Sequence, residues 1–340
     1  DYSVCIILMA VLTGIYVVAG GYMATAINDF IQGIVMLLGI IAVVIAILKE
    51  NGGLVESVNS LSAVVDPAVS AQTGAFTSLF GPEMFGLVTV IILTSMGTWG
   101  LPQMVQKFYA IKDDNAIKKG TIVSTIFALV VAGGSYFMGG FGRLYSDRID
   151  LSKGFDVIVP TMLENMSPLL IGLVVILVLS ASMSTLSALV LASSSTFTLD
   201  FLKGVLLKEM REKHQLLVMR LFIVVFIAIS AIIAIVQYNS DVTFIAQLMG
   251  ISWGALAGSF LAPFLYGLYW EKTSRTAVWV NFIFSCLIMI ANMLFRGAFP
   301  EILQSPINAG AFTMLAGLVI VPAVSLITKD ISSEPVKEIF

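Results

Sequence analysis

Charged residues are scarce in this chain of 340 residues. Asp, Glu, Lys and Arg together make up 11% of it, where a soluble domain averages about 25%. Hydrophobic residues account for 58%, and the mean hydropathy is +0.99. The net charge is −3 and the sequence has no basic patch, so nucleic acid is not an expected partner. The low fraction of charged residues and the high fraction of hydrophobic ones indicate a protein that lies within a lipid bilayer.

Cysteine and histidine are also rare. Cys5 and Cys286 both lie in apolar runs. Two such thiols form neither a disulfide framework nor a metal cluster, and we expect them to be buried and inert. His214, the single histidine, stands in the polar run KEMREKHQ, which is typical of a solvated loop. No pair of nucleophile and base is evident, so the sequence predicts neither an enzyme nor a cofactor.

Long apolar runs are abundant. A membrane-spanning helix needs about 20 mostly apolar residues, and lipid offers no partners to unpaired backbone groups. We therefore predict a multi-pass, all-α protein of the plasma membrane with nine transmembrane helices. Their predicted bounds are 3–20, 22–48, 84–108, 120–142, 168–198, 216–237, 243–269, 276–296 and 308–328.

Successive loops between the predicted helices lie on opposite sides of the membrane. The loops on one side hold 13 lysine and arginine residues, and those on the other side hold 5. The positive-inside rule places the richer set in the cytoplasm. The C-terminus is then expected to be cytoplasmic, and Asp1 outside. Because the chain begins without an initiator methionine or a basic signal-peptide region, we expect it to be part of a longer protein.

Asp29 is the single acidic residue placed well within a predicted span. A carboxylate in the membrane is costly unless it is paired, which makes it a candidate functional residue. The alternative is that the helix starts later, so that Asp29 lies at the interface near the positive end of the helix dipole.

Hydroxyl side chains crowd the span 168–198. Positions 181, 184, 185 and 188 share one helix face, and Ser187 borders it. Such hydroxyls can donate back to the helix backbone, allow close helix packing, or offer neutral oxygens to a hard cation. A carboxylate nearby would favour the cation.

The span 84–108 is interrupted by Gly97, Gly100 and Pro102. Proline removes one backbone hydrogen bond, and glycine loosens the helix further. Interrupted spans expose backbone groups that transporters use for substrate. A simple proline kink is the alternative.

Four segments resemble, in order and spacing, the sodium:solute symporter family. They are GGYMATAINDFIQGIVML at 20–37, WGLPQMVQKFYAIKD at 99–113, AxMSTLSALVLASSSTFTLDF at 181–201 and WGALAGSFLAPFLYGLYWEKTSRTA at 253–277. The resemblance implies a LeuT-type inverted-repeat helical bundle of 13 transmembrane helices. This chain would be an N-terminally truncated fragment that lacks the first four.

The function that the resemblance implies is a symporter. It would use Na⁺ as the coupling ion and import a small organic solute, such as an amino acid, a sugar or a carboxylate, by alternating access. The alternative is a membrane input module of a sensor protein, since some histidine kinases carry a similar bundle.

The resemblance also implies particular sites. A first sodium ion would be bound by the Ala181 carbonyl and the hydroxyls of Ser184 and Thr185. A possible second sodium would use Asp29, Ser184 and Ser187, although Ala188 stands where some members have another serine. Sodium is the one metal expected.

Three residues of the interrupted span match positions that face substrate in the family. They are Ser95, Thr98 and Trp99. Sugar and proline carriers tend to have an aromatic gate where Thr98 stands, so the resemblance does not transfer either substrate directly.

Overall fold

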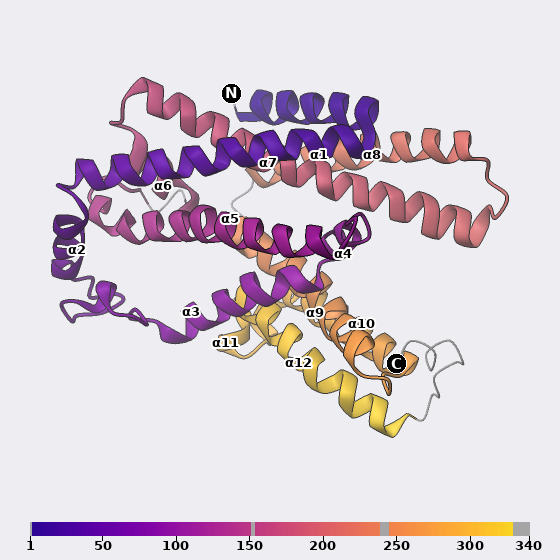
Figure 1. Ribbon diagram of the computed structural model, residues 1–340. Coiled ribbons are helices and arrows are strands. Elements are labelled where there is room, and N and C mark those ends of the chain that lie inside the picture. Colours follow the sequence, from indigo (N-terminus) through magenta and orange to yellow (C-terminus); the bar gives the residue numbers. More distant parts are fainter. Residues whose placement is uncertain (1, 151–153, 239–244, 329–340) are drawn as a thin grey trace. The chain divides into compact units, whose positions relative to one another are not determined.

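The computed structural model describes residues 2–150, 154–238 and 245–328. Apart from one isolated bridge between Asp66 and Ser70, the regular structure in these residues is helical. The chain divides into two compact units. The first comprises residues 1–65 and 111–242, and the second comprises residues 66–110 and 243–340. Both units can be followed by colour and label (Figure 1).

The first unit is built from long apolar helices, which is the arrangement that the lack of polar residues predicts. The π-helix η7 (Thr196–Leu206) directly continues α7 (Pro168–Ser195). The α-helices of this unit are α1 (Tyr2–Glu50), α2 (Leu54–Ala63), α5 (Asp114–Gly140), α6 (Ile158–Leu163), α7 (Pro168–Ser195) and α8 (Glu212–Tyr238).

Helix α1 consists of two helices that meet at Gly21. The backbone of Gly21 has φ 60° and ψ −155°, a conformation that glycine tolerates because it lacks a Cβ atom. Figure 1 shows the indigo segment doubling back on itself at the start of the chain. The predicted boundary between spans 3–20 and 22–48 therefore falls at this break.

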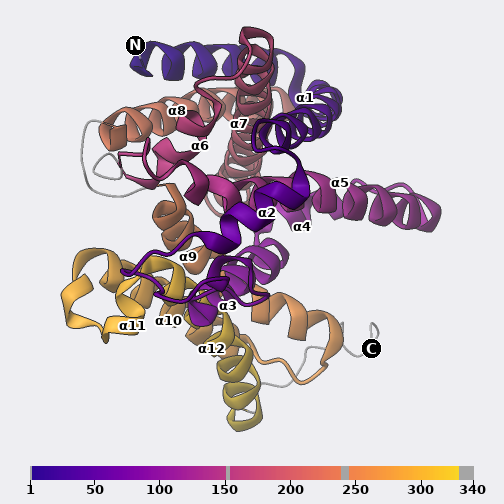
Figure 2. The same ribbon diagram turned by 90° about the vertical axis from the view of Figure 1, so that its left-hand side faces the viewer.

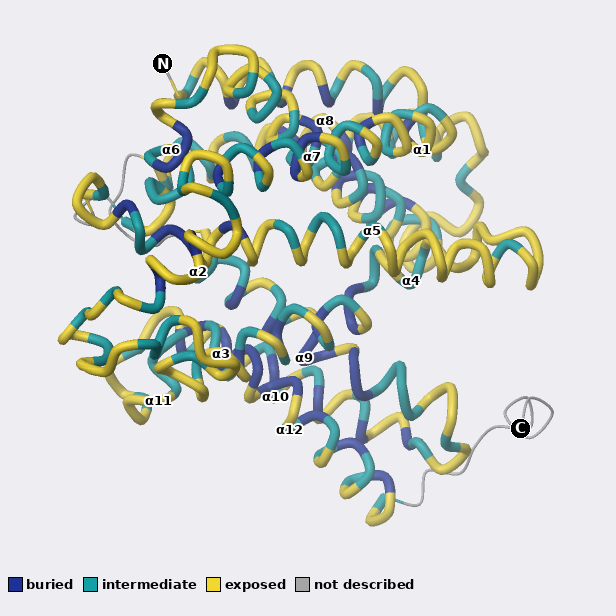
Figure 3. The backbone as a smooth tube through the Cα atoms, turned by 60° about the vertical axis from the view of Figure 1, so that its left-hand side comes forward, coloured by how far each residue is buried: buried dark blue, intermediate teal, exposed yellow. Residues whose placement is uncertain are grey.

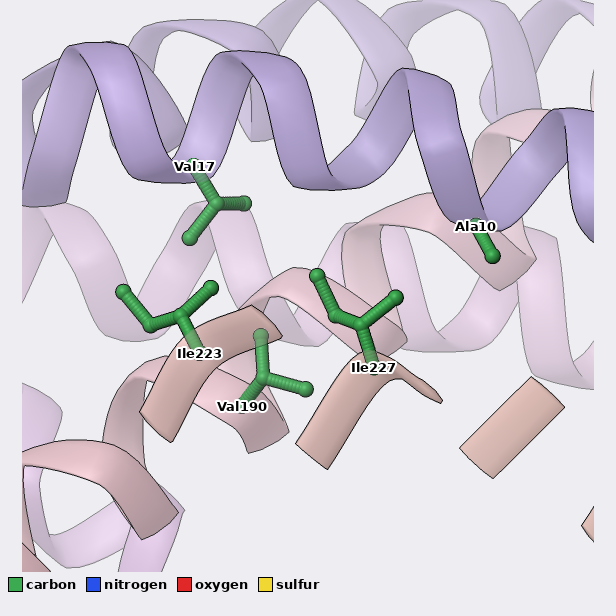
Figure 4. Close-up of a cluster of buried hydrophobic side chains, with 5 residues drawn as sticks. All are labelled: Ala10, Val17, Val190, Ile223 and Ile227. Atoms are coloured by element: carbon green, nitrogen blue, oxygen red, sulfur yellow. The ribbon is translucent and has the colours of Figure 1, made fainter. Parts of the chain in front are cut away.

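The core of the first unit lies between the first half of α1, α7 and α8. Ala10 and Val17 meet Val190, Ile223 and Ile227 there, all of them buried (Figure 4). Ala10 and Val17 are seven residues apart in α1, and Ile223 and Ile227 are four apart in α8, so each pair lies on one face of its helix. Val190 is the contribution of α7 to this cluster. By contrast, α5 projects from the unit (Figure 2) and is mostly exposed along its length (Figure 3).

The second unit holds the interrupted span and the last long helices. Helix α9 (Ile245–Tyr269) packs closely on α12 (Pro306–Ile327), since a Cβ atom at Gly254 would lie 2.6 Å from the Cα atom of Gly310. Small residues allow such close approach in membrane proteins. The main elements of the second unit are α3 (Met84–Ile91), the π-helix η2 (Ile92–Met96), η3 (Thr98–Gly100), α4 (Pro102–Phe108), α9, α10 (Arg275–Leu294), α11 (Glu301–Gln304) and α12.

Seven helices in the described residues are long and apolar enough to cross a membrane, with α1 counted once. The bent pair 84–100 and 102–108 would add an eighth. The count of nine spans stays a prediction. The expected cytoplasmic C-terminus, residues 329–340, and the first two residues of the predicted span 243–269 lie outside the described residues.

Candidate functional site

Asp29 and Ser187 lie together inside the first unit. The Ser187 hydroxyl is 3.4 Å from Oδ1 of Asp29 and 2.9 Å from the main-chain oxygen of Ser184, and can donate to either. A serine hydroxyl carries one proton, so it serves one acceptor fully at a time. Ser187 is fully buried and Asp29 is half-buried. The three residues predicted for a second sodium are thus neighbours.

The second half of α1 runs antiparallel to α7, and two contacts fix the register. Asp29 meets Ser187, and a Cβ atom at Gly39 would lie 2.5 Å from Cδ1 of Leu177. The two contacts are separated by ten residues along each helix. Residue 32 therefore lies at the level of residue 184.

Gln32 is a polar residue of this region that the sequence reasoning did not single out. Its side chain is 7% exposed, and its Oε1 atom has no hydrogen-bond partner among the residues that the structure describes. Gln32 is three residues after Asp29, so both lie on one side of α1. That spacing was the signal available in the sequence. A buried amide oxygen at the level of Ser184 adds a neutral oxygen to the neighbourhood of Asp29.

The residues predicted for a first sodium occupy one turn of α7. The hydroxyl of Thr185 donates to the main-chain oxygen of Ala181 over 2.9 Å. Thr185 is exposed and Ser184 is half-buried. A back-donated hydroxyl is also common in helices without any ion. The lone pairs of the Thr185 hydroxyl can still bind a cation. Because the same hydrogen bond also forms in helices that bind no ion, the first sodium site stays a prediction.

The interrupted span has two different faces. Gly97 and Gly100 are buried, and a Cβ atom at Gly100 would lie 2.9 Å from the Cα atom of Ala257 in α9. The helix breaks at Leu101, whose backbone is extended, and Pro102 begins α4 after a bend of 49°. The two glycines thus allow close packing on α9.

The substrate-facing candidates lie away from that packed face. Trp99 is 67% exposed and Ser95 is also exposed. Thr98 is half-buried and its hydroxyl donates to the main-chain oxygen of Ser95 over 3.0 Å. The π-helix η2 just before them was not predicted. Such bulges often occur at functional sites, because they shift the helix register.

Two expectations about isolated polar residues need correction. Cys5 is exposed, so its predicted burial is wrong, and Cys286 is half-buried, with its Sγ atom 3.5 Å from the Ser259 hydroxyl. An apolar run in a membrane protein can face lipid as well as the core, which the sequence pattern did not distinguish. His214 is exposed, but it lies in the first turn of α8 and not in a loop.

Long apolar helices that bring a carboxylate and hydroxyls together indicate a multi-pass membrane protein. A family model described as "Sodium:solute symporter family" matches residues 1–284. The chain belongs to the sodium:solute symporter family, which consists of transporters and not of enzymes. The predicted family membership is confirmed.

Curated relatives carry consistent names. The sodium/pantothenate symporter of Escherichia coli is 25% identical over 303 residues, which cover 88% of this chain and 61% of the relative. That of Haemophilus influenzae is 28% identical over 275 residues, covering 81% and 55%. The sodium/proline symporter of Staphylococcus aureus is 25% identical over 344 residues, covering 98% and 63%. The chain thus spans less than two thirds of these relatives' lengths.

A solved structure of a Na⁺-coupled sialic acid symporter, in a substrate-bound outward-open state, has a similar fold. The TM-score is 0.71 at 18% identity, and the match covers 98% of this chain and 68% of that one. The predicted fold class, an all-helical LeuT-type bundle, is therefore confirmed.

Proposed function

We propose that the intact protein is a sodium-coupled symporter that imports a small organic solute across the plasma membrane by alternating access. One observation carries the proposal. In a chain of the sodium:solute symporter family, the carboxylate of Asp29 and the hydroxyl of Ser187 meet inside a bundle of apolar helices. A carboxylate in such a place is costly unless an opposite charge or hydrogen bonds compensate it.

Sodium is the cation that this chemistry favours within the family. The second site would take Asp29, Ser184 and Ser187, with the amide oxygen of Gln32 at the same level. Hard cations prefer several oxygens, and one carboxylate among neutral oxygens binds without excess charge. The first site would take Ala181, Ser184 and Thr185, where a carbonyl and a hydroxyl already lie 2.9 Å apart.

Sodium and solute would be coupled because each binds some states of the transporter more tightly than others. Sodium would bind first and stabilise the outward-open state, solute would close the outer gate, and rocking of the bundle would open the inside. One sodium ion that moves down 100 mV contributes about 2.3 kcal/mol, enough for roughly fifty-fold accumulation of a neutral solute. Sodium is the coupling ion in this scheme, and the scheme requires no enzymatic cofactor.

The solute would contact the exposed side of the interrupted span. Ser95, Thr98 and Trp99 supply a hydroxyl pair and a large aromatic face there. The solute class is an amino acid, a sugar or a carboxylate. A sensor input module, the alternative, finds no support among the relatives, whose names are those of symporters.

The test is uptake by the intact protein in proteoliposomes. Labelled proline, pantothenate, sialic acid and glucose would be offered under an inward sodium gradient and, separately, under an equal potassium gradient. We expect concentrative uptake of at least one solute with sodium alone. Equal uptake under both gradients, or none of any solute by a well-folded protein, would refute the proposal.

A further inference from the structure

Tyr16 makes a hydrogen bond to the helix that carries the candidate ion ligands. Its hydroxyl donates to the main-chain oxygen of Met183 in α7 over 3.1 Å, and the side chain is partly buried. Met183 directly precedes Ser184 and Thr185. Because helical carbonyls point toward the C-terminal end of their helix, the Tyr16 hydroxyl lies between the levels of Met183 and Ser187.

The two halves of α1 therefore contact one short stretch of α7 by separate polar contacts. Tyr16, from the first half, reaches Met183, and Asp29, from the second half, reaches Ser187. The two halves are joined at Gly21, so they form a hairpin that holds residues 183–187. All the hydroxyls assigned to sodium lie within this stretch.

We propose that Tyr16 is a positioning residue for the sodium site, an inference that rests on the proposed function. Its bond would fix the rotation and height of α7 against α1, and so the distances between the Asp29 carboxylate and the α7 oxygens. Binding sites lose affinity when their ligands move by about 0.5 Å, so one such bond matters. A carbonyl oxygen has two lone pairs, so the backbone bond of the helix is retained.

Thr13, close to Tyr16 in the chain, provides a matched control for this role. Thr13, on the same helix, is fully buried, and its hydroxyl has no hydrogen-bond partner among the described residues. Thr13→Val removes a buried hydroxyl for which the described residues provide no hydrogen-bond partner, whereas Tyr16→Phe removes one that donates to α7. Both replacements preserve shape closely, so packing is similar in the two variants.

The test is equilibrium binding of radioactive sodium to the purified intact protein, with lithium as competitor. We expect Tyr16→Phe to raise the half-saturating sodium concentration roughly three- to tenfold, the size expected for one lost hydrogen bond. Maximal binding should be unchanged, and the ratio of lithium to sodium affinity should shift. Thr13→Val should match the wild type. An unchanged half-saturation in Tyr16→Phe, or an equal rise in Thr13→Val, would overturn the inference.

A second variant separates positioning from general loosening. If Tyr16 acts through the α7 oxygens, Tyr16→Phe should have a smaller effect in a Ser184→Ala background, because that ligand is already lost. Fully additive effects would contradict the inference. Absence of saturable sodium binding in the wild type would instead refute the proposed function, so the two failures are distinguishable.

Discussion

The Ser187 hydroxyl lies 3.4 Å from Oδ1 of Asp29, although the two residues are 158 positions apart in the chain. The contact joins the one carboxylate predicted inside a span to the span richest in hydroxyls. A carboxylate that meets a serine within an apolar bundle offers a cation both charged and neutral oxygens.

Thr185→Ala tests the first sodium site. The replacement removes one hydroxyl oxygen beside the Ala181 carbonyl and creates no large cavity, since Thr185 is exposed. We expect the half-saturating sodium concentration for uptake to rise at least severalfold while the melting temperature stays nearly constant. Thr121→Ala, at an exposed and equally back-bonded threonine of α5, is the matched control. Unchanged sodium dependence in Thr185→Ala would remove this residue from the site.

Gly39→Ala tests the register of α1 on α7. The added methyl group would lie 2.5 Å from Cδ1 and 3.2 Å from Cβ of Leu177. Overpacking of this kind typically costs about 1–3 kcal/mol. Thermal unfolding in detergent should show a lower melting temperature, and Leu177→Ala added to Gly39→Ala should restore part of the loss. A Gly39→Ala protein as stable as the wild type would contradict the close contact.

Thr98→Tyr tests the solute site. The larger side chain would fill space on the exposed side of the interrupted span, so the half-saturating solute concentration should change by more than the half-saturating sodium concentration. The measurement is initial uptake with each varied in turn. Equal changes in both would indicate that Thr98 supports the helix and does not face the solute.

The sequence predicted the helical class and the elements that carry the site, because apolar runs and single polar residues within them are local signals. Asp29 and the hydroxyls of 181–187 were visible in this way. The break at Gly21 was also visible, as a boundary between two apolar runs. In each case the information lay within one or two helical turns.

Other features depend on contacts between distant segments. The burial of Gln32 follows from the register of α1 against α7, which no local pattern specifies. The same is true of the bond from Tyr16 to Met183. The π-helices Ile92–Met96 and Thr196–Leu206 have no distinctive composition. Exposure of Cys5 depends on which side of an apolar helix meets its neighbours.

The sodium-to-solute stoichiometry of Asp29→Asn tests the central claim most directly. Asn keeps the size and one oxygen of Asp29 but removes the charge that would hold a cation. Reversal potentials in proteoliposomes should show that the variant loses one coupled sodium ion or loses coupled uptake altogether. Asp147→Asn, at an exposed aspartate outside the helices, should behave as the wild type. Normal stoichiometry and normal sodium affinity in Asp29→Asn would contradict the account.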